Sequence, residues 1–144
     1  MALQVRIKKH VPELILPKKI HIGDWIDLRA AETVHLEPNE YKLFSLGISV
    51  ELPLGYEAHI VPRSSTFNNF GIIQANHMGI IDETYKGDND LWMFPAIAFR
   101  PTTIHLNDRI CQFRIVQKMQ TIQIIEVETL GNDSRGGLGS TGIK

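Results

Sequence analysis

The chain has 144 residues, with 15 basic residues, 16 acidic residues and a formal net charge of −1. A chain of this length fits one domain, which can bury about 70% of its unfolded surface without a metal or a disulfide. The balanced charge excludes a bulk field that would favour nucleic acid or an anionic membrane, so a polyanionic ligand would have to be held by a few placed residues.

The beginning of the chain carries no recognisable targeting segment. Residues 1–19 contain neither an uninterrupted apolar core nor a cleavage site, and no stretch of the chain approaches the ~20 apolar residues of a membrane span. The single cysteine, Cys111, fits a small buried side chain. These features predict a cytoplasmic protein.

Short strands separated by turns make up most of the sequence. Apolar and polar residues alternate near 3–7, 46–52, 56–60 and 122–127, and turn residues recur at a spacing typical of all-β sandwiches and barrels. One short helix is predicted from Ser64 to Phe70, with Ser64 or Ser65 as its cap and with Phe67 and Phe70 packed inward. The pattern therefore predicts an all-β domain.

The last 14 residues, 131–144, differ from the rest because they hold five of the 11 glycines and almost no large apolar side chain. We expect a mobile arm here. Its G-x-G-x-x-G pattern is not a dinucleotide fingerprint, because no helix can follow it. Backbone N–H groups together with Arg135, Ser140 and Thr141 could instead wrap an anion, although a tail without a ligand is the alternative.

The stretch from Phe70 to Asp90 predicts a hairpin, because two pairs of β-branched residues, Ile72–Ile73 and Ile80–Ile81, flank a turn. Asp82 and Tyr85 follow the second pair, just before a glycine. A carboxylate, an aromatic ring and a flexible backbone in one place indicate a small-ligand pocket. The alternative is a hairpin with a solvated acidic end.

Two further groups of polar residues could bind an anion or a metal. Arg63, Ser64 and Ser65 suit phosphate oxygens, unless they are only a helix cap beside a solvated arginine. Asp27 lies between two apolar residues, so its carboxylate should face inward, either toward a metal or in a salt bridge with a cation such as Arg29 or Arg109. The histidines show no metal-ligand spacing.

Five segments, in order, resemble the five motifs of the trimeric dUTPases: Trp25–Ala30, Pro62–Ser65, Gly79–Gly87, Asn107–Phe113 and Arg135–Gly142. The resemblance implies a jelly-roll-like barrel over residues 1–130 and a C-terminal arm over 131–144. It also implies a homotrimer that hydrolyses dUTP to dUMP and pyrophosphate. Each active site would take its base pocket, its phosphate site and its arm from three different chains.

The resemblance also implies a role for each site residue. Asp82 would act as general base on the attacking water, with Gln112 helping to place it. Mg²⁺ would clamp the three phosphates, and Asp27 would hold this ion through water. The remaining residues would bind the substrate. Arg63, Ser64 and Ser65 would contact the phosphates, Asn76, Gly79 and Ile81 the uracil, and Tyr85 the deoxyribose. The arm would close over the bound nucleotide through Arg135, Leu138, Gly139, Ser140 and Thr141.

The sequence departs from the family pattern at the residue that covers uracil. Leu138 stands where many members carry a stacking aromatic residue. A bulky cluster, Leu91–Phe94, follows the predicted pocket, and with it the sequence resembles a Bacillus-like subgroup of the trimeric dUTPases. If this cluster is a strand with one face in the core, Trp92 and Phe94 share one side, and we expect Met93 on the nucleotide side, with Trp92 as the alternative cover.

Two alternative functions remain open at this stage. A dCTP deaminase shares the fold and an arginine-serine phosphate motif, but it would need a glutamate at the base. A regulatory module could keep the fold without catalysis.

Overall fold

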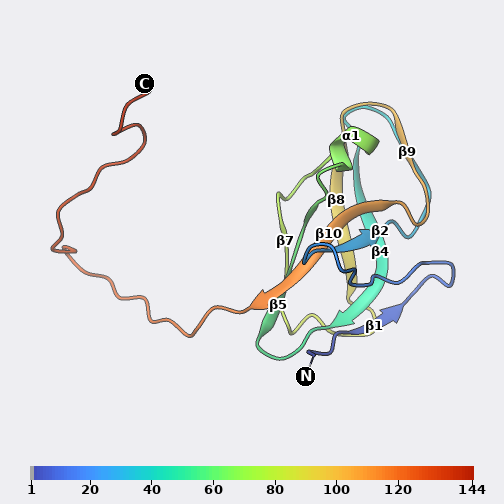
Figure 1. Ribbon diagram of the computed structural model, residues 1–144, viewed down its shortest axis with the longest axis horizontal. Coiled ribbons are helices and arrows are strands. Elements are labelled where there is room, and N and C mark those ends of the chain that lie inside the picture. The colour runs from blue at the N-terminus through green and yellow to red at the C-terminus, as the bar shows by residue number, and fades with distance from the viewer. Residues whose placement is uncertain (1) are drawn as a thin grey trace.

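The computed structural model describes residues 2–144 (Figure 1). Its elements in chain order are β1 (Arg6–Lys9), β2 (Ile26–Arg29), β3 (Val34–Leu36), β4 (Tyr41–Glu51), β5 (Tyr56–Pro62), α1 (Thr66–Phe70), β6 (Ile72–Gln74), β7 (Gly79–Ile81), β8 (Leu91–Ala98), β9 (Thr102–Ile104) and β10 (Arg109–Gln117). The single short helix confirms the all-β prediction.

Two four-stranded antiparallel sheets pack face to face and form a jelly-roll-like barrel. Their strand orders are β1-β4-β8-β6 and β2-β10-β5-β7, and a two-stranded sheet, β3-β9, lies beside them. The inner faces meet in one apolar core, in which the ring of Trp92 on β8 lies 5.1 Å from that of Phe113 on β10, edge to face. Cys111 is fully buried in this core, as predicted.

Strand β8 shows how the sequence pattern becomes a two-sided strand. Its residues alternate between half-buried and buried along its whole length, so that Trp92 and Phe94 are fully buried while Leu91 and Met93 face the other way. The predicted division of the Leu91–Phe94 cluster between two faces is confirmed.

The helix differs from the prediction at its cap. It begins at Thr66, and Ser65 occupies the cap position without making a side-chain hydrogen bond. The buried hydroxyl of Thr66 holds this end instead, because it accepts a hydrogen bond from the Arg63 N–H at 2.8 Å and donates one to the Ile110 carbonyl at 2.9 Å. These bonds place Arg63 at a fixed point beside β10.

The two phenylalanines of the helix behave differently. Phe70 packs against the core as predicted. The prediction for Phe67 is wrong, since its side chain is 49% exposed and meets the exposed ring of Phe99 edge to face, with 6.1 Å between ring centres.

The predicted hairpin between β6 and β7 is also wrong. Strand β6 pairs with β8, whereas β7 pairs with β5, so the two strands belong to different sheets and the turn between them crosses from one sheet to the other. The buried side chain of Gln74 links the two sheets at this point by donating a hydrogen bond to the Ile60 carbonyl at 3.1 Å.

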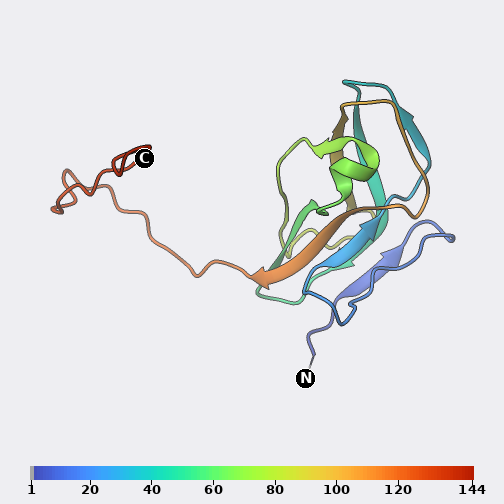
Figure 2. The ribbon, with the colours of Figure 1, turned by 45° about the horizontal axis from the view of Figure 1, so that its top comes forward.

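After Gln117 the chain leaves the barrel and runs away from it to the C-terminus (Figures 1 and 2). Residues 118–144 are exposed and contain no strand, so the strand predicted over 122–127 is wrong for a single chain. The division of the protein at residue 130 stays a prediction. Within residues 2–144, no helix is long and apolar enough to cross a membrane.

Candidate active site

A cavity of about 460 Å³ opens between β5, β7 and β8. Six residues that the sequence suggested for the base, the sugar and the catalytic water line it together: Asn76, Gly79, Ile81, Asp82, Tyr85 and Met93. The remaining walls are mainly apolar and include Ile60, Leu91 and Trp92. An apolar cleft with a few convergent polar groups is the usual form of a small-molecule site.

Asp82 follows directly on the end of β7, at the start of a tight turn. One of its carboxylate oxygens accepts a hydrogen bond from the Thr84 N–H at 2.6 Å, and the Tyr85 N–H donates to the Asp82 carbonyl at 3.1 Å. The bond from the Thr84 backbone lowers the pKa of Asp82 below its ordinary value. The carboxylate is therefore ionised at neutral pH, as a general base must be.

Tyr85 is held in place by the loop that follows it. Its hydroxyl donates a hydrogen bond to the Leu91 carbonyl at 3.0 Å, and Asp90 closes the loop by accepting the Gly87 N–H at 2.8 Å. The buried hydroxyl of Ser49 on β4 donates to the Asp88 carbonyl at 2.9 Å. The ring is thus fixed against one wall of the cavity.

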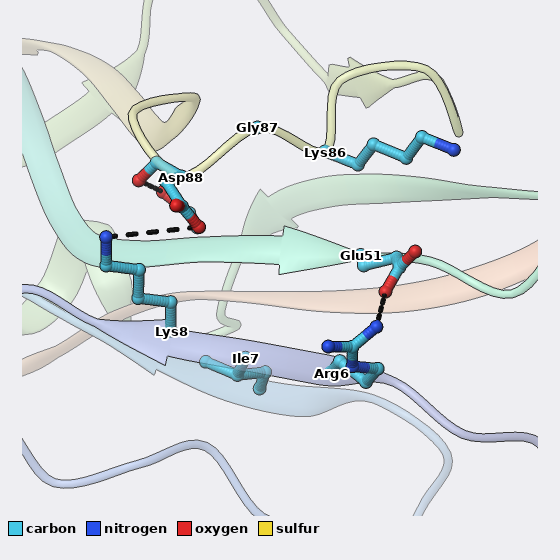
Figure 3. Close-up of a pocket in the computed structure, with 8 residues that line it drawn as sticks. Arg6, Ile7, Lys8, Glu51, Lys86, Gly87 and Asp88 are labelled. Atoms are coloured by element: carbon cyan, nitrogen blue, oxygen red, sulfur yellow. Dashed lines mark hydrogen bonds and ion pairs between the residues drawn. The ribbon is translucent and has the colours of Figure 1, made fainter.

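A second, smaller cavity of about 170 Å³ lies between this loop and strands β1 and β4 (Figure 3). Exposed charges surround it: Arg6 pairs with Glu51 at 2.5 Å, and Lys8 lies 3.9 Å from Asp88. None of the residues suggested by the sequence lines this cavity.

Arginines gather around one carboxylate on β2, at the opposite edge of the sheet from β7. Asp27 on β2 lies 3.0 Å from Arg63 and 3.2 Å from Arg109, so the salt bridge considered from the sequence does form. Arg29 belongs to the same group, and its pKa is lowered by burial and by the neighbouring positive charge of Arg109. Three positive charges around one negative charge leave an excess of two, which suits a polyanion.

Arg29 and Arg109 were not singled out from the sequence as site residues. Both lie inside segments that carry the resemblance, Trp25–Ala30 and Asn107–Phe113, and this was the available signal. Their convergence on Asp27 depends on the register of β2 against β10, in which Gln112 stands opposite Asp27.

Gln112 and the two serines complete this second group. The Gln112 side chain donates a hydrogen bond to the Pro62 carbonyl at 3.1 Å, next to Arg63. Arg63 and Ser64 line a separate cavity of about 460 Å³, and Ser65 caps the nearby helix. This cavity and the cavity of Asp82 and Tyr85 share no lining residue, and the cavity of Asp82 and Tyr85 contains neither arginine nor serine.

The suggested arm residues lie apart from both groups. Residues 131–144 are exposed along their whole length and extend away from the barrel (Figure 2). The structure therefore divides the suggested site into three parts that one chain does not bring together.

A family model for dUTPase matches residues 25–142. The chain belongs to the dUTPase family. Its relatives include the SPbeta prophage-derived deoxyuridine 5'-triphosphate nucleotidohydrolase YosS of Bacillus subtilis, which is 58% identical over 99% of this chain and 100% of that protein. The deoxyuridine 5'-triphosphate nucleotidohydrolase of Corynebacterium diphtheriae is 38% identical over 96% of this chain and 93% of that protein. The resemblance seen in the sequence is confirmed.

Solved dUTPase structures share the fold. A mutant of the Staphylococcus bacteriophage 80alpha dUTPase with dUpNHpp superposes with a TM-score of 0.79 at 21% identity, over 97% of this chain and 99% of that one. A mutant dUTPase of the Staphylococcus aureus phage phi11, described with a structural Mg(II) ion, superposes with a TM-score of 0.75 at 20% identity, over 88% of this chain and 98% of that one.

The side chains of this dUTPase family member do not form a metal cage. Within residues 2–144, no three His, Cys, Asp or Glu side chains are grouped to hold a metal. Asp27 is already paired with two arginines. Mg²⁺ keeps several waters and is commonly bound through one carboxylate and the phosphates of a substrate. The donor set thus fits an ion that is held mainly by a bound triphosphate and by water.

Proposed function

We propose that this protein hydrolyses dUTP to dUMP and pyrophosphate. The observation that carries the proposal is that an ionised Asp82, Tyr85 and Asn76 line one cavity together. Membership of the dUTPase family and the 58% identity to a dUTP nucleotidohydrolase support it.

The uracil base enters between Asn76 and β7, where backbone groups and the Asn76 amide read its edge. A side chain at Gly79 would be crowded, because a Cβ atom there would lie 3.2 Å from the Cβ of Ile60, which is tighter than an ordinary contact. Tyr85 packs against the deoxyribose, and the bond from its hydroxyl to the Leu91 carbonyl favours this orientation of the ring. A 2′-hydroxyl would meet this ring, so ribonucleotides are excluded. Met93 covers the base.

Asp82 removes a proton from a water that attacks the α-phosphorus in line. A bond forms between the water oxygen and this phosphorus, the bond to the bridging oxygen breaks, and pyrophosphate leaves. Arg63, Ser64 and Ser65 bind the phosphate oxygens, and Gln112 orients the attacking water. When Mg²⁺ is bound with the triphosphate, it neutralises charge that develops on the phosphates.

The excess positive charge around Asp27 strengthens the phosphate site. Arg109 pairs with the same carboxylate as Arg63, and Arg29 is near enough to interact electrostatically with all three groups, so an incoming triphosphate meets three guanidinium groups. Bidentate arginine contacts are strong and directional, which favours one orientation of the phosphate chain.

We propose that three chains assemble to build each site. The base cavity, the residues suggested for phosphate binding and the arm are separate within one chain. The segment after β10 carries apolar side chains that are 59–89% exposed, namely Met119, Ile122, Ile124, Ile125 and Leu130. Burying such side chains is worth about 1.5–3 kcal/mol each, so they should pack on a neighbouring chain. The alternation over 122–127 then forms a strand there, and Arg135, Leu138, Gly139, Ser140 and Thr141 close over a neighbour's nucleotide.

The deaminase alternative needs a glutamate at the base. Glu83 is next to Asp82, but its carboxylate is bound to Gly55 and Lys118 and does not line the cavity. The hydrolase is therefore favoured.

A panel of dUTP, dCTP, dTTP and UTP with Mg²⁺ tests the proposal. We expect pyrophosphate from dUTP, little from the other three nucleotides, and no ammonia. Release of ammonia from dCTP would identify a deaminase, and no turnover of any nucleotide would favour the regulatory module.

A further inference from the structure

Glu83 connects three segments that are distant in the sequence. Its carboxylate accepts a hydrogen bond from the Gly55 N–H in the turn between β4 and β5 at 2.5 Å. Its other oxygen pairs with the ammonium group of Lys118, the first residue after β10. The Lys118 N–H in turn donates to the Gly55 carbonyl at 2.9 Å. With 13% of its side chain exposed, Glu83 is well enclosed.

The position of Asp82 depends on this connection. Strand β7 pairs with β5 through only three residues and ends at Ile81, at the edge of its sheet. Beyond Ile81 no ladder hydrogen bond holds the chain, and the bond from the Thr84 N–H fixes only the internal shape of the turn. Two sets of contacts attach the turn to the barrel: the Tyr85 hydroxyl bound to the Leu91 carbonyl, and the contacts of Glu83, the residue directly after Asp82.

The same contacts fix the point at which the C-terminal segment leaves the barrel. Strand β10 ends at Gln117, and the C-terminal segment runs away from the barrel from Lys118 onward (Figure 1). Both charges of the pair persist at neutral pH, because Lys118 and the Gly55 N–H lower the pKa of Glu83 while Glu83 raises the pKa of Lys118.

We infer that Glu83 and Lys118 are positioning residues that join the turn beginning at Asp82 to the first residue of the C-terminal segment, residues 118–144. We call this pair, together with the bond from the Gly55 N–H, the clasp. The inference rests on the proposed function, in which Asp82 is the base and the segment reaches a neighbouring site.

A partly exposed ion pair contributes little to stability. A shift of about 1 Å in a catalytic group can nevertheless cost about 100-fold in rate. Loss of the clasp should therefore affect turnover much more than unfolding, which separates a positioning role from a purely structural one.

The test uses Glu83→Gln, Lys118→Met, the double variant and the charge exchange Glu83→Lys with Lys118→Glu. We expect each single variant to lower kcat for dUTP by about 10-fold with little change in KM. The double variant should be no worse than either single variant, because both remove the same interaction. The charge exchange should recover part of the loss.

A matched control is the exposed pair Arg6–Glu51 between β1 and β4 (Figure 3). Arg6→Met and Glu51→Gln should leave kcat unchanged. Single clasp variants within about twofold of the wild type, or losses that multiply in the double variant, would overturn the inference.

Hydrogen exchange separates this inference from the proposed function. Lys118→Met should speed exchange at the amides of 82–85 and of Lys118 without changing exchange in β8. Faster exchange in a protein that fails to hydrolyse dUTP would reject only the proposed function. Unchanged exchange in an active enzyme would reject only the clasp.

Discussion

Met93 and Trp92 are neighbours on β8 that point to opposite sides, and their replacement by alanine should affect different properties of the protein. Trp92 is fully buried against Phe113, whereas Met93 is half-buried and lines the cavity. If Met93 covers the uracil, Met93→Ala should weaken nucleotide binding, while Trp92→Ala should mainly lower stability.

The magnitudes follow from what each change removes. Trp92→Ala empties a core position, which costs about 3–5 kcal/mol. For a domain of this size the loss corresponds to a melting temperature lower by about 6–20 °C. Met93→Ala removes three heavy atoms from the cavity wall, worth about 1–2 kcal/mol when covered by a ligand. That loss corresponds to about 5–30-fold weaker binding.

Calorimetric titration with a non-hydrolysable imido analogue of dUTP, together with thermal melts, measures both effects. Leu138→Ala is the third variant, because Leu138 is fully exposed on the arm in a single chain. The reasoning fails if Leu138→Ala alone weakens binding while Met93→Ala and Trp92→Ala change only the melting temperature.

Three further outcomes are expected. Tyr85→Ala should raise the rate on UTP relative to dUTP, measured as a ratio of kcat/KM, because the ring no longer blocks a 2′-hydroxyl; an unchanged ratio would place ribose exclusion elsewhere. A chain that ends at Asn132 should sediment as a trimer yet lose most of its activity, whereas a monomeric full-length protein would contradict the shared site. Lys118 and the Gly55 N–H lower the pKa of Glu83. The contribution of the ionised Glu83 carboxylate to the stability of the fold is therefore complete above its ordinary pKa of 4.5, and it disappears as the pH falls through the lower pKa of the folded protein. The small melting-temperature difference between the wild type and Glu83→Gln at pH 7 should therefore shrink as the pH falls below the ordinary value of 4.5, and a constant difference would contradict this.

The sequence predicted features that depend on local pattern. The alternation through Leu91–Phe94 determines which side chains a strand can bury, and this was enough to place Trp92 in the core. The grouping of Asp82 and Tyr85 was equally accessible, since a single turn carries both residues. The five ordered motifs indicated the family because they extend over most of the chain.

Other features depend on contacts that no local pattern contains. The β-branched pairs at 72–73 and 80–81 indicate strands but not the sheet to which each belongs, so the hairpin was predicted wrongly. Arg109 reaches Asp27 only through the register of β10 against β2. The strand predicted over 122–127 has no partner in one chain, and under the proposed assembly its partner is a neighbouring chain.

The most direct test of the account is the turnover of Asp82→Asn. If the ionised Asp82 is the general base, the variant should bind the imido analogue and melt like the wild type. Its kcat for dUTP should be lower by at least about 100-fold. An Asp82→Asn protein that releases pyrophosphate from dUTP within a few-fold of the wild-type rate would contradict the assignment of the base.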